Sequence, residues 1–463
     1  MVYLNAPYGG EWRALYGRGK RLFTKGFVVQ PEGPRLDEVR TWLEATKNRG
    51  MALGLKHTKE ALYRLNLDHT PPHVLHVAGS NGKGTVCALM AASLTLSNQS
   101  NLFFSSPHLV RVEERLRLNG VPIEAERLDA ALKAVHHASQ IEPAIPLTFF
   151  EVTYLSAMQV ASDAHVEVLI LETGLGGRLD ATRSGPATAS LITAISGEHR
   201  DILGDSIAQI AKEKAAIARP GCPILIRKPL DEATEKAMLE EASMAGQSEL
   251  GEQVEPAHAR LVAIPLTAPV RSEALILAKA LFEEVGLVHT ELETAFEQLQ
   301  WPARLQHLSQ ASTGSHSFIL DAAHNPSGLE RVLPELEHCI KDAIQSKKGW
   351  TLLLGTSPQE DLASFCAPLM ALCERHPPRQ VVFTEPQGGR YPGVACESLA
   401  SLPWPYSPAF AAPLPTDALH YLSTQVASEV GLVVSLGSLY LQGNLLEAFG
   451  LSSDEHLSLL SKD

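Results

Sequence analysis

The sequence has few of the features that mark secreted, membrane or nucleic-acid-binding proteins. Its six cysteines form no CxxC pair and no metal-ligand cluster, which is typical of reduced thiols rather than a disulfide framework. No apolar run approaches the roughly 18 residues that a membrane span needs. The 39 basic residues are outnumbered by 52 acidic ones, and the net charge of -13 disfavours a broad nucleic-acid or anionic-membrane surface. We therefore expect a cytoplasmic protein without nucleic-acid or membrane partners.

The hydrophobic content is high enough for more than one domain. Hydrophobic residues make up 45% of the 463 positions, which suffices for two or three cores of ordinary size. Strands alternate with helices twice, first over residues 74–227 and again over residues 317–448. Such alternation predicts mostly parallel α/β sheets covered on both faces, the second unit being smaller. We place the boundary near residue 299, which gives domains at residues 1–299 and 300–463.

Four stretches have weaker patterns. Residues 1–34 show no clear periodicity, and residues 111–118 are expected to form one strand. The charged helix predicted from Asp231 to Ala245 leads into a proline-spaced segment, up to residue 270, that has no assignment. The proline-rich stretch 386–415 is expected to be a long loop of the kind that carries function.

A glycine-rich loop follows the first apolar strand. The segment "HVAGSNGKGT" fails the Walker pattern, because Val77 stands where the strict spacing needs glycine and Gly84 separates Lys83 from Thr85. A strand, a glycine loop and a helix N-terminus nonetheless present N–H groups and a lysine to an anion. The sequence therefore predicts a phosphate site formed by Gly79, Ser80, Asn81, Gly82, Lys83, Gly84 and Thr85.

Several polar side chains follow other strands of the same predicted sheet. Glu172 ends the strand "VEVLILE", and His199 follows the strand "SLITAI". Because ligands of α/β sheets bind at the carboxyl ends of strands, these side chains and the segment "SSPHL" are expected to meet the glycine loop. Magnesium prefers hard oxygen donors, so Glu172 and Ser106 fit one ion, and His199 fits a second.

The chain resembles a known family in seven separate blocks, spread from about residue 36 to residue 450. The family is the dihydrofolate synthase/folylpolyglutamate synthase group of the Mur ligase superfamily, which has the same blocks in the same order. The blocks are "HVAGSNGKGT", "FFSSPHLVRVEERLRLNG", "LTFFEVTYLSA", "LETGLGGRLDAT", "HRDILGDSIAQIAKEKAAI", "WPARLQ" and "LDAAHNP".

This resemblance implies an ATP-dependent amide ligase with a P-loop-type ATPase domain followed by a Rossmann-like domain. In the family the lysine matched by Lys83 reaches the transferred phosphoryl group, and the residues matched by Ser106 and Glu172 hold one magnesium ion. The family histidine matched by His199 holds a second ion, and the lysine matched by Lys214 is carbamylated. From the second domain, the resemblance implies ATP contacts by Arg304 and Asp321, with His324 close by.

The resemblance also implies a pterin site. The positions that match it are Met51, Ala52, Leu53, Thr148, Phe150, Leu179, Asp180 and Ala181. The chain departs from the family pattern in four places. It has Arg183 where the family has the asparagine of "DATN", and "SGEH" (residues 196–199) where the family has "GLDH". Glu273 replaces an asparagine near the adenine, and "GMALGL" lacks the acidic residue that bacterial bifunctional members place against the pterin.

The implied reaction joins L-glutamate to dihydropteroate or to a folate. Transfer of a phosphoryl group from ATP to the acceptor carboxylate gives an acyl phosphate, which the glutamate amine attacks. We expect a monomer that binds ATP, two Mg²⁺ ions and these small molecules. Two alternatives remain open, a Mur-type ligase of peptidoglycan precursors and a nucleotide-binding paralogue without catalysis. Retention of the phosphate-, metal- and ATP-site residues disfavours the paralogue.

Overall fold

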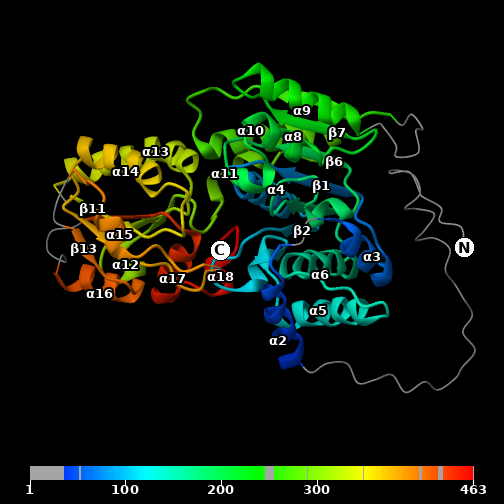
Figure 1. The fold of residues 1–463 in the computed structure, drawn as a ribbon, viewed down its shortest axis with the longest axis horizontal. Coiled ribbons are helices and arrows are strands. Elements are labelled where there is room, and N and C mark those ends of the chain that lie inside the picture. The colour runs from blue at the N-terminus through cyan, green and yellow to red at the C-terminus, as the bar shows by residue number, and fades with distance from the viewer. Residues whose placement is uncertain are drawn as a thin grey trace, which may run out of the picture. The chain divides into compact units, whose positions relative to one another are not determined.

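The computed structural model divides into two compact units (Figure 1). It describes residues 36–51, 54–245, 255–288, 290–347, 349–389, 391–405, 409–425 and 431–461. The first unit holds the described residues up to Pro107, together with Arg115–Leu266 and Ala274–Glu297. The second holds His108–Glu114, Thr267–Glu273 and the chain from Gln298 onward. Residues 1–34, for which the sequence gives no clear pattern, lie outside the described residues.

One mostly parallel sheet forms the centre of the first unit. Its strand order is β4-β3-β2-β5-β1-β6-β7-β8, and only the pairings of β3 are antiparallel. The central strands are apolar and buried on both faces, as parallel sheets covered by helices require. The bounds are β1 (His73–Ala78), β2 (Asn101–Phe104), β3 (Leu116–Leu118), β4 (Val121–Pro122), β5 (Val168–Glu172), β6 (Ala189–Ile192), β7 (Pro223–Arg227) and β8 (His258–Val262).

Helices cover this sheet along its length. Figure 1 shows α8 and α9 near β7, and α5 and α6 beyond β2. The helices are α2 (Leu36–Thr46), α3 (Lys56–Leu65), α4 (Lys83–Leu96), α5 (Ala125–Gln140), α6 (Phe149–Asp163), α7 (Arg200–Leu203), α8 (Ile207–Ala215), α9 (Glu232–Met244), α10 (Val270–Val285) and α11 (Leu292–Gln298). Short 3-10 turns lie at η1 (Lys47–Arg49), η2 (Val112–Arg115) and η3 (Ala181–Ser184).

The second unit has a six-stranded sheet in the order β13-β12-β11-β14-β10-β9. All its pairings are parallel except that of β9 with β10. Alternate residues of each strand face opposite sides, so Ile319 and Leu352 join one core and Phe318 and Leu353 join another. The bounds are β9 (Gln306–Leu308), β10 (Ser317–Leu320), β11 (Trp350–Leu354), β12 (Gln380–Phe383), β13 (Ala409–Ala411) and β14 (Leu432–Leu436).

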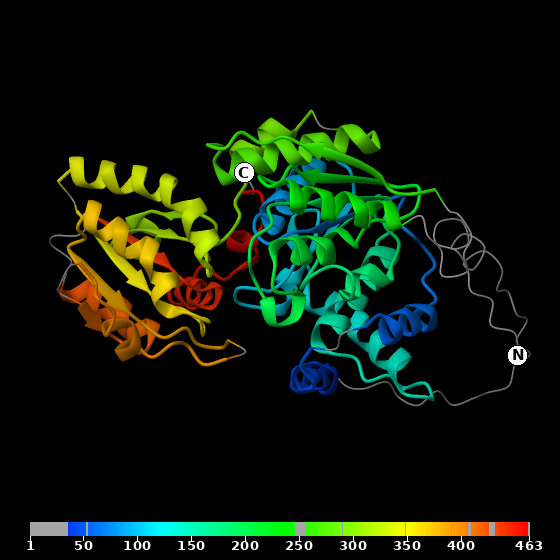
Figure 2. The same ribbon diagram turned by 45° about the horizontal axis from the view of Figure 1, so that its top comes forward.

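Helices pack on both faces of this smaller sheet (Figures 1 and 2). Residues of α13, α14 and α15 line the first core, and residues of α16 and α17 line the second. The bounds are α12 (Gln310–Thr313), α13 (Pro326–Gln345), α14 (Leu362–Arg375), α15 (Cys396–Ala400), α16 (Pro415–Gln425), α17 (Leu439–Ala448) and α18 (Asp454–Leu457). The expected fold class, a large mostly parallel α/β sheet followed by a smaller α/β sheet, is confirmed. No helix within the described ranges is long and apolar enough to cross a membrane.

A short early segment, His108–Glu114, belongs by its contacts to the second unit. Leu109 packs there with Ala303 and Leu439. A side chain at position 443 would collide with the carbonyl group of Leu109, so Gly443 lets the segment lie directly against helix α17.

The structure corrects two expectations and assigns one segment that the sequence left open. Residues 111–118 are not one strand, because the Glu114 carboxylate accepts the N–H groups of Leu109, Val110 and Arg111 and the backbone turns there as η2 before β3 begins. The proline-rich stretch 386–415 is not simply a loop, since its described part contains α15 and the edge strand β13. The unassigned segment contains β8, which extends the first sheet.

Candidate active site

The glycine loop joins β1 to α4 and needs glycine at two of its positions. Gly79 has φ 147°, and a side chain there would collide with the Thr193 hydroxyl. Gly82 has φ 89° and precedes the first residue of α4, whose N-terminus has no side-chain cap. Uncapped N–H groups at the start of a 14-residue helix favour an anion. The loop therefore has the local geometry of a phosphate site.

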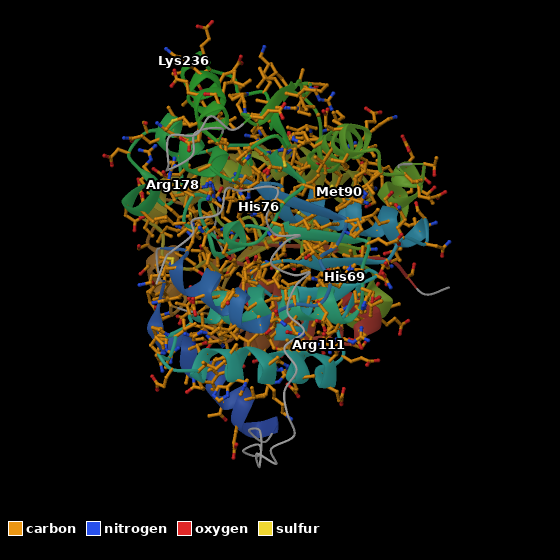
Figure 3. All side chains as sticks on the ribbon, turned by 90° about the vertical axis from the view of Figure 1, so that its right-hand side faces the viewer. His69, His76, Met90, Arg111, Arg178 and Lys236 are labelled. Atoms are coloured by element: carbon orange, nitrogen blue, oxygen red, sulfur yellow. The ribbon has the colours of Figure 1, made fainter. Side chains whose placement is uncertain are left out.

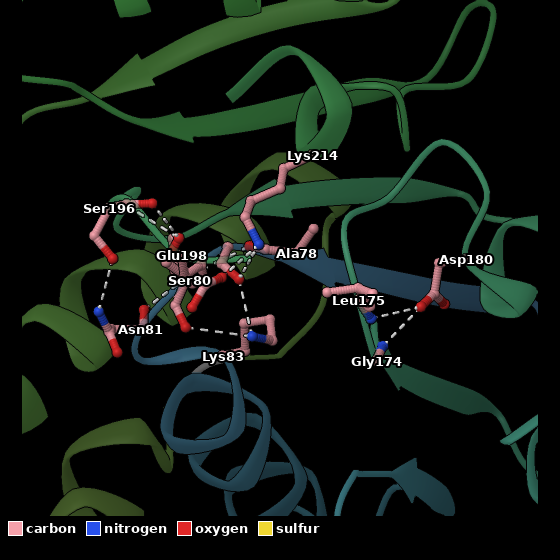
Figure 4. Close-up of polar contacts among 12 residues, drawn as sticks. Ala78, Ser80, Asn81, Lys83, Gly174, Leu175, Asp180, Ser196, Glu198 and Lys214 are labelled. Atoms are coloured by element: carbon pink, nitrogen blue, oxygen red, sulfur yellow. Dashed lines mark hydrogen bonds and ion pairs between the residues drawn. The ribbon is translucent and has the colours of Figure 1, made fainter. Parts of the chain in front are cut away.

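The segment after β6 holds the glycine loop in place. The N–H groups of Ser80 and Asn81 donate to the Ala194 carbonyl oxygen at 2.8 and 3.3 Å, and the Thr193 hydroxyl donates to the Asn81 carbonyl oxygen at 2.8 Å. The Ser196 N–H donates to the Ser80 hydroxyl at 3.0 Å. These bonds fix the loop against the neighbouring strand, and Figure 4 shows Ser196 beside Ser80 and Asn81.

Two lysines meet at the carbonyl oxygen of Gly79. Lys83 Nζ lies 2.8 Å from this oxygen and Lys214 Nζ lies 3.0 Å from it (Figure 4). Lys214 is 2% exposed and also contacts Glu198 Oε1 at 2.8 Å. Two cations and one carboxylate therefore border the loop, which leaves an excess of positive charge for an anionic ligand.

Burial and the partner's charge shift the pKa values of Lys214 and Glu198 in opposite directions. Burial lowers the pKa of Lys214, Glu198 opposes that shift, and the nearby charge of Lys83 adds to it. For Glu198, burial favours the neutral form, but the ammonium groups of Lys214 and Lys83 outweigh it and lower the pKa to about 2. Glu198 is therefore ionised at neutral pH.

Glu172 lies at the same edge of the sheet as the glycine loop. The register of β1 with β5 pairs it with Val77, two residues before Gly79. Its carboxylate is buried and lies 3.4 Å from the N–H of Ser106. The structure therefore brings together Ser106 and Glu172, whose hydroxyl and carboxylate oxygens are the donors that Mg²⁺ prefers.

His199 lies at the surface. It is exposed, has φ 47° and directly precedes the first residue of the short helix α7. The lysine expected to join it, Lys214, contacts the preceding residue Glu198 instead. Searched over the described part of the chain, no group of three His, Cys, Asp or Glu side chains forms a metal site by itself.

Part of the expected pterin set, Phe150, Leu179, Asp180 and Ala181, lies in or against the loop after β5. A side chain at Gly174 would lie 2.7 Å from the Phe150 ring, so this loop packs directly on that ring. The Asp180 carboxylate accepts the N–H groups of Gly174 and Leu175, each at 2.9 Å. Leu179 is 42% exposed, whereas Ala181 is buried.

Two other expected pterin positions lie apart from that loop contact. Thr148 caps α6 through a reciprocal pair of bonds with Glu151, which also accepts the Thr58 hydroxyl at 2.8 Å. Met51 is half exposed. Ala52 and Leu53, expected at the same site, lie outside the described residues.

In the second unit Arg304 stands between two residues with left-handed backbone, Ala303 at φ 57° and Leu305 at φ 46°. The Asp321 carboxylate accepts the N–H groups of Leu305 and Ala323, each at 2.8 Å. Burial raises the pKa of Asp321, and the Arg304 charge acts against that shift. The Asp321 oxygens therefore bind backbone N–H groups, one of them in the residue that follows Arg304.

His324 and Glu273 complete the expected residues of this unit. His324 Nδ1 lies 2.9 Å from the Ala322 carbonyl oxygen, just after Asp321. Glu273, which replaces an asparagine of the family, is buried and pairs with Arg331 at 2.9 Å.

Sequence reasoning missed Glu198 and Thr193 as parts of the phosphate region. Glu198 directly precedes His199, and it is the carboxylate partner of the buried Lys214 on α8. A lysine is almost never fully buried unless it is paired, so an acidic partner for Lys214 could have been expected. Thr193 had no comparable signal, since a hydroxyl at the end of a strand is common.

Comparison with known proteins gives a consistent set of relatives, although no family model matches the chain. A dihydrofolate synthase/folylpolyglutamate synthase of Haemophilus influenzae is 31% identical over 336 residues, which cover 67% of this chain and 76% of the relative. The Escherichia coli protein of the same name is 32% identical over 352 residues, covering 71% and 81%.

Solved structures agree with these relatives. An E. coli FolC structure in complex with DHPP and ADP has a TM-score of 0.74 at 25% identity and covers 90% of this chain and 99% of its own. A bifunctional folylpolyglutamate synthase/dihydrofolate synthase with Mn, AMPPNP and L-glutamate bound has a TM-score of 0.73 at 25% identity, covering 91% and 100%.

Proposed function

The chain belongs to the dihydrofolate synthase/folylpolyglutamate synthase family, and we propose that it adds L-glutamate to dihydropteroate, to folates, or to both. It is an ATP-dependent acid–amino-acid ligase that uses a divalent metal ion. The observation that carries the proposal is the edge of the first sheet, where the glycine loop, two lysines and the Ser106–Glu172 pair lie together.

The phosphate-binding residues proposed here are Gly79, Ser80, Asn81, Gly82, Lys83, Gly84 and Thr85. In the structure Lys83 Nζ binds carbonyl oxygens of its own loop, Gly79 at 2.8 Å and Ser80 at 3.4 Å. A triphosphate offers this ammonium a stronger, charged acceptor, so we propose that Lys83 turns from the loop to the transferred phosphoryl group. The helix N-terminus of α4 then faces the remaining phosphate charge.

We propose that Ser106 and Glu172 hold the first magnesium ion and that His199 and Lys214 hold the second. Bound there, the ions would offset negative charge on the phosphoryl oxygens. Support for the first ion comes from the type of oxygen donor that Ser106 and Glu172 carry and from the 3.4 Å between the Ser106 N–H and the Glu172 carboxylate. A carbamylated Lys214 would supply an anionic oxygen where an ammonium would be repelled, and intact mass measurement tests for this modification.

The acceptor carboxylate is unreactive until it is phosphorylated. The acyl phosphate formed from ATP gives the glutamate amine a good electrophile, and phosphate leaves through a tetrahedral intermediate. The side chains named here orient the reactants and balance charge, and orientation alone is worth roughly 7–11 kcal/mol in favourable cases.

We propose that residues 1–299 form the ATP-binding domain and residues 300–463 a Rossmann-like ligase domain. Arg304 supplies positive charge to ATP from the second domain, with Asp321 and His324 in the same site. Support comes from the two residues with left-handed backbone on either side of Arg304. This conformation is unfavourable for residues other than glycine, and residues held in it cluster at functional sites.

The acceptor site is proposed to consist of Met51, Ala52, Leu53, Thr148, Phe150, Leu179, Asp180 and Ala181. The contact between Gly174 and the Phe150 ring supports it, because a flat aromatic ring beside a glycine backbone suits a planar pterin. We further propose that the chain acts as a monomer in the cytoplasm. The free thiols of its six cysteines support that location.

The test is a phosphate-release assay with purified protein, ATP, Mg²⁺ and glutamate, run with dihydropteroate and with tetrahydrofolate as acceptors. Glutamate-dependent release with at least one acceptor is expected. ATP binding without release with either acceptor would contradict the proposal and favour a paralogue without catalysis. Release that requires a peptidoglycan precursor instead would favour a Mur-type ligase.

A further inference from the structure

The Asp180 carboxylate is buried and bound by uncharged donors. Its Oδ2 accepts the N–H groups of Gly174 and Leu175 at 2.9 Å, and its Oδ1 accepts the Thr182 N–H at 3.0 Å. The Thr182 hydroxyl donates to the same Oδ1. One side chain thereby ties both ends of the loop after β5 and fixes its shape.

The Thr182 hydroxyl has a second partner inside the sheet. His76 of β1 is fully buried, and its Nε2 lies 2.8 Å from the Thr182 hydroxyl oxygen. The hydroxyl has one proton, which it gives to Asp180, so His76 must be the donor in this contact. The ring therefore carries its proton on Nε2, and a chain of bonds runs from His76 through Thr182 to Asp180.

The environment of His76 agrees with a neutral ring. Burial, together with the charges of Arg219 and Arg183, lowers the pKa of His76 well below its usual value. Its Nδ1 has no hydrogen-bond partner among the described residues. Figure 3 shows His76 in the packed interior, whereas the labelled Lys236 projects at the outside. The single N–H group of the neutral ring, on Nε2, therefore donates to Thr182.

The loop held in this way forms part of the proposed acceptor site. Gly174 packs on the Phe150 ring, and Leu179 is partly exposed on the same loop. The glycine loop is held separately, by its own bonds to Ala194 and Ser196. The acceptor loop also contacts α8, where the Arg178 N–H donates to the Glu213 carbonyl oxygen at 2.9 Å. The bonds from Ala194 and Ser196 to the glycine loop involve none of His76, Thr182 and Asp180, so a change in this chain of bonds leaves them in place.

We propose that Thr182 and His76 are positioning residues that hold Asp180, and through it the loop Gly174–Ala181, in the shape that receives the acceptor. They set the affinity for the pterin-bearing acceptor and leave the use of ATP unchanged. This inference rests on the proposed function, since it assigns the loop to the acceptor.

The experiment compares Thr182→Val, which keeps the shape but removes the hydroxyl, with Thr182→Ser, which restores it. Thr182→Val removes the hydroxyl's bond to the Asp180 carboxylate and its bond from His76. The acceptor KM is expected to rise at least about tenfold, as for the loss of a hydrogen bond to a charged group, while the ATP KM changes less than about twofold. Thr182→Ser is expected to return the acceptor KM to within about threefold of wild type.

Thr188→Val is the matched control. The Thr188 hydroxyl also binds β1, at the N–H and carbonyl groups of Val74, with distances of 2.9 and 3.1 Å. This contact lies at the other end of the strand from the glycine loop. The variant is expected to lower the melting temperature but not the acceptor affinity. Equal shifts of the acceptor KM in both valine variants, or no recovery in Thr182→Ser, would overturn the inference.

A second pair of variants serves if Thr182→Val does not fold. His76→Gln keeps an N–H near the position of Nε2 and is expected to retain the acceptor KM, whereas His76→Met is expected to raise it. An unchanged acceptor KM in His76→Met would also overturn the inference. Failure of the wild type to release phosphate with either acceptor would instead count against the proposed function itself.

Discussion

Two loops at the carboxyl ends of adjacent strands differ in how a carboxylate is bound beside them. The glycine loop after β1 is bordered by charged groups, Lys83, Lys214 and Glu198. In the loop after β5 the buried Asp180 carboxylate accepts backbone N–H groups and a hydroxyl, while the ion pairs of that loop, from Arg178 to Glu213 and Glu241, lie on its α8 and α9 side. The first arrangement suits a polyanion and the second a mostly uncharged ring.

The two carboxylates show the difference directly. The ammonium groups beside Glu198 outweigh its burial and lower its pKa, whereas burial outweighs the hydrogen bonds of Asp180 and raises its pKa. A buried carboxylate is thus held ionised by cations in one loop and is opposed by desolvation in the other. Substitutions in the two loops should therefore differ in how much activity or stability they remove and in how that loss depends on pH.

The largest effect is expected from Lys83→Ala, which removes charge from the phosphate loop. Glutamate-dependent phosphate release should fall at least about 100-fold, as when a group that stabilises developing charge is lost. Lys236→Ala is the control, because that side chain is exposed on α9. Comparable rates for Lys83→Ala and Lys236→Ala would contradict a charge-based phosphate loop.

Glu198→Gln should have the next largest effect, on stability. In protein whose Lys214 is unmodified, the two ammonium groups lower the pKa of Glu198 from 4.5 to about 2, which corresponds to roughly 3 kcal/mol of stabilisation at neutral pH. Because the folded-state pKa is the lower one, this stabilisation is complete above about pH 4.5 and is lost as the pH falls toward 2. Urea unfolding in EDTA at several pH values measures it.

The control for that variant is Glu213→Gln. Glu213 pairs with Arg178 at 2.7 Å, but both side chains are about one third exposed. Its loss should cost under about 1 kcal/mol. Equal losses for the two variants, or a Glu198→Gln loss that stays constant down to pH 3, would remove the distinction between the loops.

Asp180→Asn should lower the free energy of unfolding by a smaller amount, about 1 kcal/mol at neutral pH. The variant weakens the hydrogen bonds of the carboxylate, but it also removes a buried charge, which partly offsets that loss. The folded-state pKa of Asp180 lies above 3.8, so wild-type stability from this group declines as the pH rises from 3.8 through that pKa. The variant should lack this decline in the same urea titration. A loss as large as that of Glu198→Gln would refute the comparison.

The smallest effect is expected from Gly82→Ala. A side chain at Gly82 meets nothing within 4 Å, so only its φ of 89° opposes alanine, at about 1 kcal/mol. Gly286→Ala is the matched control, since that glycine has φ 68° and equal space. Both should lose similar stability by calorimetry, and only Gly82→Ala should weaken ATP binding. Unchanged ATP affinity would place the anion away from this turn.

The sequence was sufficient for elements whose signals are local. Strands such as β1 and β5 are continuous apolar runs, and the glycine cluster directly marks the turn from β1 into α4. The confirmed α/β architecture follows from such runs alternating with helices. The edge strand β8 was missed because most of its residues are exposed, so it carries no buried pattern to detect.

The site was less predictable where a side chain acts on distant backbone. Glu114 lies in a polar run that reads as strand, yet it accepts three N–H groups and turns the chain. Asp180 drew attention through the family resemblance, but its bonds to Thr182 and, through it, to His76 join segments over 100 residues apart. Hydrogen bonds of this kind have no periodicity, so only coordinates reveal them.

The early segment His108–Glu114 affects whether the two units can be produced as separate fragments, because it belongs by its contacts to the second unit. A fragment starting at Gln298 would lack Leu109, which fills the space over Gly443 and Leu439. Its helix α17 would expose the apolar surface that Leu109 covers, while the complementary fragment would keep His108–Glu114, between β2 and β3, without the surface to which it binds. Expression of the halves from separate genes would therefore give two incomplete folding units whose solubility depends on each finding the other.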